Sequence, residues 1–115
     1  MGLKMNWKQF KKRLLEQHRN LCFIDRQKCK RGLNEVRILR FFFCGNFKPY
    51  VEKYNSIGFL FVVERNHFDK SWTIDGYSID KDTQKNTQTY FRYSDDRAEG
   101  VYIKAFEKIS EMMKL

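Results

Sequence analysis

The sequence has no apolar run long enough to cross a bilayer. Its longest central stretch, IGFLFVV (57–63), is far shorter than the roughly 20 residues that a membrane helix needs. No repeat of about 20–50 residues recurs, and no Gly/Ser/Pro-rich linker divides the chain, whose only proline is Pro49. With 42% hydrophobic residues, we expect residues 1–115 to form a single compact globular domain.

Targeting and disulfide signals are also missing. The first residues lack the apolar segment and cleavage site of a secretory signal, and Asn6 stands where a myristoylation pattern needs Ser or Thr. The chain has an odd number of cysteines, namely Cys22, Cys29 and Cys44. Reduced thiols are the simplest interpretation, so we expect a cytoplasmic protein that does not bind membranes.

No complete metal or cofactor motif is present. His18 and the three cysteines have the ligand chemistry for zinc, but no C-x-x-C pair occurs among them. Asp80, Asp82 and Gln84 are spaced like the first ligands of a calcium loop. Lys85 and Phe91 stand where that loop needs Gly and Glu, so we expect a polar hairpin loop, with no metal and no cofactor.

The charge is positive and uneven. The formal net charge is +9, and residues 1–50 hold 13 Lys and Arg against 3 Asp and Glu, whereas residues 51–115 hold 10 against 11. Such asymmetry favours an acidic partner. The predicted binding residues for nucleic acid or an acidic partner are Lys8, Lys11, Lys12, Arg13, Arg19, Arg26, Lys28, Lys30, Arg31, Arg37 and Arg40.

Hydrophobic periodicity predicts an α+β fold with the order α-β-β-β-β-β-α, in which an N-terminal and a C-terminal helix pack on an antiparallel sheet of about five strands. A capping box of Asn6 and Gln9 opens the first helix, and Ser94, Asp95 or Asp96 caps the last, with Asp96 and Glu99 matching a second box. The expected elements are a helix over 6–19, strands over 21–28, 34–44, 59–65, 71–79 and 87–93, and a helix over 98–113.

The first hairpin allows a prediction of register. If Asp25 faces Arg37, opposite charges pair across the strands, whereas a shift by one residue would pair Arg26 with Arg37. Arg40 then projects from the other face and needs a carboxylate, solvent or a partner. A bulge near Leu39 would instead bring both arginines to one face.

Both faces of this hairpin carry apolar side chains, which two helices cannot readily cover together. Either the helices divide between the faces, or part of one face meets a partner, for instance in a homodimer. The two sets are Leu21, Phe23, Leu39, Phe41 and Phe43 on one face and Cys22, Ile24, Val36, Ile38 and Phe42 on the other.

Three hypotheses for function remain open. The first is a non-catalytic protein that binds nucleic acid or a nucleoprotein complex through its basic N-terminal half. The second is a phage- or mobile-element-encoded inhibitor of a host nuclease that acts by protein–protein contact. The third, a small metal-independent ribonuclease, would need His18 and His67 to converge as acid and base.

Overall fold

A computed structural model describes residues 5–44, 48–80 and 86–114 of the chain. It confirms the predicted α+β architecture, with one antiparallel sheet in the order β1-β2-β3-β4-β5 and an additional short helix in the connection around Pro49. The elements are α1 (Trp7–Gln17), β1 (Leu21–Arg31), β2 (Asn34–Phe43), α2 (Lys48–Tyr54), β3 (Ser56–Arg65), β4 (Trp72–Asp80), β5 (Asn86–Asp95) and α3 (Ala98–Met112).

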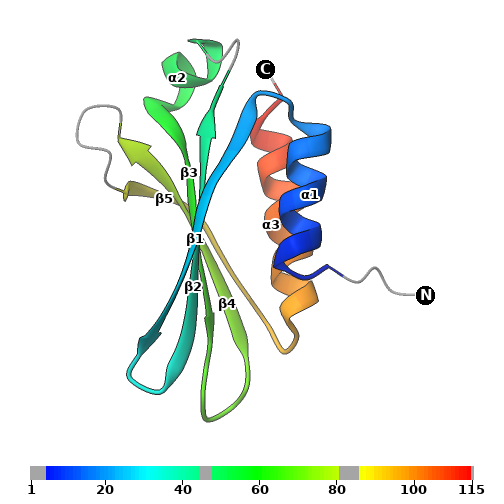
Figure 1. Cartoon of the computed structure of the whole chain (residues 1–115), viewed down its shortest axis with the longest axis vertical. Coiled ribbons are helices and arrows are strands. Elements are labelled where there is room, and N and C mark those ends of the chain that lie inside the picture. Colours follow the sequence, from blue (N-terminus) through cyan, green and yellow to red (C-terminus); the bar gives the residue numbers. More distant parts are fainter. Residues whose placement is uncertain (1–4, 45–47, 81–85, 115) are drawn as a thin grey trace.

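The two long helices lie side by side on the same face of the sheet (Figure 1). They do not divide between the faces, so one face stays open along the described residues. The short helix α2 closes the end of the core, because the Tyr54 hydroxyl donates to the Met112 carbonyl at 2.6 Å. The sheet is therefore packed on one side only.

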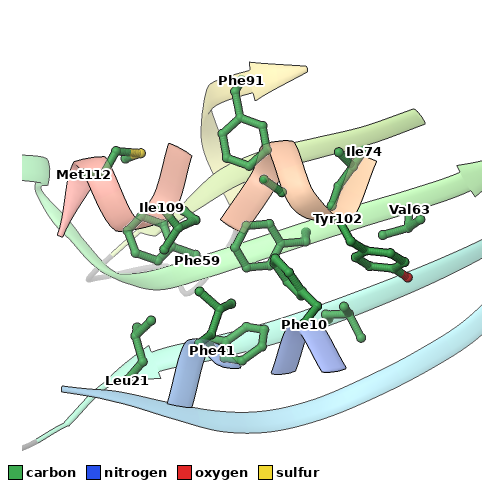
Figure 2. Packing of buried hydrophobic residues seen from close by; sticks show 14 of the residues in the cluster. Phe10, Leu21, Phe41, Phe59, Val63, Ile74, Phe91, Tyr102, Ile109 and Met112 are labelled. Atoms are coloured by element: carbon green, nitrogen blue, oxygen red, sulfur yellow. The ribbon is translucent and has the colours of Figure 1, made fainter. Parts of the chain in front are cut away.

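Aromatic rings fill the space between the helices and the sheet (Figure 2). Phe10 of α1 is fully buried, and its ring centroid lies 5.2 Å from that of Phe61 and 5.3 Å from that of Tyr102. Phe41 and Phe59 complete the layer from the neighbouring strands β2 and β3. Burial of such large side chains is the main driving force for this packing.

Of the two capping boxes predicted at the starts of the long helices, only one is present in the structure. The predicted capping box of α1 is confirmed, since Asn6 and Gln9 exchange two hydrogen bonds of 2.9 Å. The predicted box at α3 is wrong, because the N-cap residue is Arg97 and its side chain makes no capping bond. Instead, Asp95 Oδ1 accepts from the Arg97 N–H at 3.1 Å, and the carboxyl group fills the space beside Gly100.

The predicted register of the first hairpin is also wrong. Asp25 lies opposite Arg40 rather than Arg37. The turn has only two residues, the first being Gly32 with a φ of 62°, so β1 continues to residue 31 instead of ending at 28. A bulge between Phe23 and Asp25 adds a further shift. This bulge lies in β1 and not near Leu39 of β2, so Arg37 and Arg40 still project to opposite faces.

The predicted loop between β4 and β5 falls mostly on residues 81–85, outside the part that the structure describes, as do the proposed calcium-loop positions Asp82, Gln84 and Lys85.

Candidate functional site

Four cationic side chains surround the indole ring of Trp7 in the first turn of α1. The guanidinium carbon of Arg26 lies 4.3 Å from the ring centroid, and that of Arg37 lies 5.6 Å from it. The ammonium groups of Lys11 and Lys8 lie at 5.6 and 5.9 Å. Attraction to the ring holds these cations together, although they repel one another.

Arg37 connects this cluster with the residues near the β1–β2 hairpin turn. Its Nη1 donates to the Tyr102 hydroxyl at 3.2 Å, and its Nε is buried with no hydrogen-bond partner. Burial raises the pKa of Tyr102, with the bond from Arg37 acting in the opposite direction, so the hydroxyl is neutral at pH 7 and accepts from the guanidinium. Lys28 lies opposite Arg37 in the register, so the two side chains leave the sheet on the same side.

A hollow of about 360 Å³ lies beside Arg37, at the end of the sheet beyond the first turn of α1. It brings together three cationic side chains, one carboxylate and one indole ring. Its lining residues are Lys28, Cys29, Lys30, Glu35, Val36, Arg37, Val63 and Trp72.

Arg65 and Trp72 extend the same arrangement across the sheet. They lie opposite each other on β3 and β4, with the guanidinium carbon 5.8 Å from the indole centroid, and the Arg65 Nε is buried without a partner. A second hollow of about 200 Å³ adjoins the first through Lys30 and Glu35 and includes Lys70. Arg65 is not among the predicted binding residues, because the charge asymmetry of the sequence pointed to the N-terminal half only.

We call this region the basic aromatic surface. The turns of the β1–β2 and β3–β4 hairpins extend past the helices at this end of the molecule (Figure 1). Among the described residues, no carboxylate lies within 4.0 Å of any of its cations. It comprises Trp7, Lys8, Lys11, Arg26, Lys28, Lys30, Arg37, Arg65 and Trp72.

Three of the predicted basic residues lie elsewhere on or after α1. Lys12 is well exposed and lies 4.0 Å from Glu16 of the next turn. Arg13 borders a shallow hollow beside Phe106 of α3. Arg19 follows the C-terminal end of α1, away from the basic aromatic surface. These side chains therefore do not converge with the cations around Trp7.

The remaining two predicted residues form ion pairs on the open face. Arg31 lies 3.0 Å from Glu64. Arg40 donates two hydrogen bonds to Asp25, one of 2.7 Å from Nε, and these hold the pKa of the carboxyl group below its ordinary value. Arg40 thus has the carboxylate that the sequence analysis required for it.

The two histidines do not form a catalytic pair. His18 ends α1, and its Nε2 lies 3.0 Å from the Ser110 hydroxyl of α3, where burial lowers the pKa of the imidazole. His67 lies in the β3–β4 turn, at the opposite end of the molecule (Figure 1). The ribonuclease hypothesis needs both groups at one phosphate, and this geometry does not bring them together.

The cysteines are not all reduced. Cys22 and Cys44 form a disulfide that joins the start of β1 to the residue after β2, with 6.1 Å between the Cα atoms, whereas Cys29 is free and exposed. The expectation of three reduced thiols is therefore wrong for two of them. A proposed zinc set of His18 and the cysteines has lost two thiolates to this bond. Among residues 5–44, 48–80 and 86–114, no group of three His, Cys, Asp or Glu side chains is placed to hold a metal.

None of the helices in the described ranges has the length and apolar character needed to cross a membrane. No family model, no curated protein and no solved structure matches this chain.

Proposed function

We propose that the protein is a non-catalytic binding protein that engages nucleic acid through its basic aromatic surface. The observation that carries the proposal is the convergence of seven cationic side chains near Trp7 and Trp72, with Glu35 as the one carboxylate that lines the hollow beside Arg37 and Trp72. A surface that only kept the protein soluble would not need its cations gathered over aromatic rings.

Phosphate groups are the partner that this chemistry fits. Each neutralised phosphate releases condensed counterions, so clustered Lys and Arg gain affinity from salt release that dispersed cations do not. Arg37 and Arg65 have guanidinium groups with no carboxylate partner among the described residues, and arginine binds phosphate oxygens through paired N–H groups. Indole rings add contacts to bases.

Fluorescence anisotropy with labelled single- and double-stranded oligonucleotides tests the proposal. We expect binding at low salt and a linear fall of log K with log salt. The slope should be about −0.7 per phosphate contact on single strands and about −0.9 per contact on duplex DNA. The double substitution Lys28→Glu with Lys30→Glu should weaken binding and flatten the salt dependence. Wild-type protein that binds neither strand type at low salt would refute the proposal.

The chain offers a matched control at its other end. Lys48 and Lys53 lie in α2, beyond the opposite end of the helices (Figure 1), and Lys48 is 83% exposed. Lys48→Glu with Lys53→Glu makes the same change in net charge but leaves the basic aromatic surface intact. We expect this variant to keep most of the affinity. An equal loss in both variants would assign binding to overall charge and not to this surface.

A second candidate function is inhibition of another protein, such as a host nuclease, by direct contact, as a phage or mobile-element product would do. The open sheet face favours it, because Ile38, Phe42, Leu60, Val62 and Tyr77 are only half-buried there. The same face would serve a homodimer. Light scattering of the purified protein distinguishes a homodimer from a monomer. Under the inhibitor hypothesis, affinity purification from the host should recover one stoichiometric partner.

A cytoplasmic location fits either candidate function. The Cys22–Cys44 disulfide is the feature that would form more readily in an oxidising compartment. Counting the free thiols of protein isolated from its native host, with alkylation at lysis, decides which state the protein has in the cell.

A further inference from the structure

We propose that the hollow beside Trp72 holds a single nucleotide of an unpaired strand, with the base against Trp72 and the adjoining phosphates between Lys28 and Arg37. This inference rests on the proposed nucleic-acid function and specifies its ligand as single-stranded rather than duplex. It concerns the larger hollow, which is lined by both apolar and cationic side chains.

The size of the hollow fits one nucleotide. Pockets for small ligands measure roughly 300–1,000 Å³, and this one, at about 360 Å³, is near the lower limit. A duplex instead presents grooves that take a helix or a free two-stranded ribbon. The β1–β2 hairpin is not such a ribbon, since β2 stays paired with β3 as far as Glu35 and Arg65, next to the hairpin turn.

The lining divides into parts that suit a base and parts that suit a phosphate. Val63 and the Trp72 indole give apolar contact area, and stacking on aromatic rings is how proteins hold unpaired bases without reading sequence. Lys28, Lys30 and Arg37 give the positive charge. Glu35 offsets only part of it.

Arg37 is already positioned for a ligand oxygen. Tyr102 accepts from its Nη1, and the Trp7 ring lies against the guanidinium from the side of α1. The buried Nε has no partner, so the guanidinium is held in place by a hydroxyl and a ring but lacks a counter-anion. A phosphate entering the hollow would supply that charge. Lys28, opposite Arg37 on β1, would approach the same anion.

Tryptophan fluorescence tests the site directly, because Trp7 and Trp72 are the two tryptophans of the chain. In the Trp7→Phe variant, Trp72 is the only reporter. We expect oligothymidylate or oligouridylate to quench its emission and a self-complementary duplex to bind more weakly with less quenching. Quenching by either strand supports the inference. Duplex binding that is tighter than both overturns it.

Substitution of Trp72 separates this inference from the proposed function. Trp72→Leu should lose about tenfold or more in affinity for single strands while the salt dependence stays unchanged, since no cation is removed. Unchanged affinity would overturn the nucleotide site and leave nucleic-acid binding in place, whereas wild-type protein that binds no nucleic acid would end both. If a tryptophan variant does not fold, Lys28→Glu at the exposed edge strand must weaken the quenching seen in wild-type protein, and unchanged quenching overturns the inference.

Discussion

Arg40 of β2 and Asp25 of β1 form a two-bond ion pair across the first hairpin, on the sheet face opposite the helices. Each side chain is about one-third exposed. Asp25 directly follows the β1 bulge, so the register that the bulge produces is the one that places these two charges opposite each other. Opposite charges placed directly across two strands stabilise that register relative to its neighbours.

A double-mutant cycle should measure a small coupling between Asp25 and Arg40. Because solvent screens the pair, we expect Asp25→Asn and Arg40→Gln each to lower the free energy of unfolding by about 1 kcal/mol or less, with the double variant close to either single one. Urea unfolding measures all four proteins. If the losses of the two single variants add up fully in the double variant, Asp25 and Arg40 do not interact.

The same pair should also give a pH dependence. The pKa of Asp25 is lower in the folded protein than in the unfolded chain, so its stabilising contribution is present above the ordinary carboxyl pKa of 3.8 and is lost as the pH falls through the folded value. Asp25→Asn should therefore flatten the acid limb of the stability curve below about pH 4. If the stability of the Asp25→Asn variant falls with pH as steeply as that of wild type, other carboxyl groups cause the acid dependence.

Reduction should destabilise the protein through the loss of one disulfide. Cys22 and Cys44 are 22 residues apart, and closing a loop of this length stabilises a fold by about 2–4 kcal/mol, mainly through the unfolded chain. Unfolding with and without reductant measures the difference. Cys29→Ser, at the exposed free thiol, is the control and should change little. Three reactive thiols in the denatured, unreduced protein would contradict the bond.

The face assignments in the first hairpin could be predicted only at its disulfide end, because beyond the bulge the register differs by three residues and Asp25 lies on the face opposite to the predicted one. Near the disulfide the true register differs from the predicted one by two residues, and an even shift leaves every side chain on its face. Leu21, Phe41 and Phe43 were therefore assigned correctly to the core. The error came from the turn, because Gly32 allows a two-residue loop that charge pairing alone did not reveal.

The candidate site could be predicted only in its cationic part. Composition identified Arg26, Lys28 and Arg37 as basic residues of one half of the chain, but the predicted register placed Arg26 and Lys28 on the face opposite to Arg37, whereas all three lie on the same face. Arg65 and Trp72 come from strands whose positions depend on the order of the sheet, and the sequence did not determine that order. The disulfide was missed for a similar reason, since the two cysteines meet only through strand pairing.

The α1–α3 contact should become weaker at acid pH through His18. Burial lowers the pKa of this imidazole from its ordinary value of 6.5, so the unfolded chain binds the proton more readily. Its contribution to stability is thus present above pH 6.5 and is lost as the pH falls toward the folded pKa. NMR titration should find a pKa below 6.5. His18→Gln should remove this pH dependence, while Ser110→Ala, which removes only the partner hydroxyl, should keep it.

Truncation of Phe10 should cost more stability than any surface change on the same helix. Its ring is fully buried between Phe41, Phe61 and Tyr102, so Phe10→Ala leaves a cavity and should lower the free energy of unfolding by about 3–5 kcal/mol. Lys12→Ala, on the exposed side of α1, is the matched control and should stay within about 0.5 kcal/mol of wild type. Chemical unfolding monitored by circular dichroism measures both. A small loss at Phe10 would mean that α1 is not packed on the sheet, and the cations around Trp7 would then have no fixed arrangement.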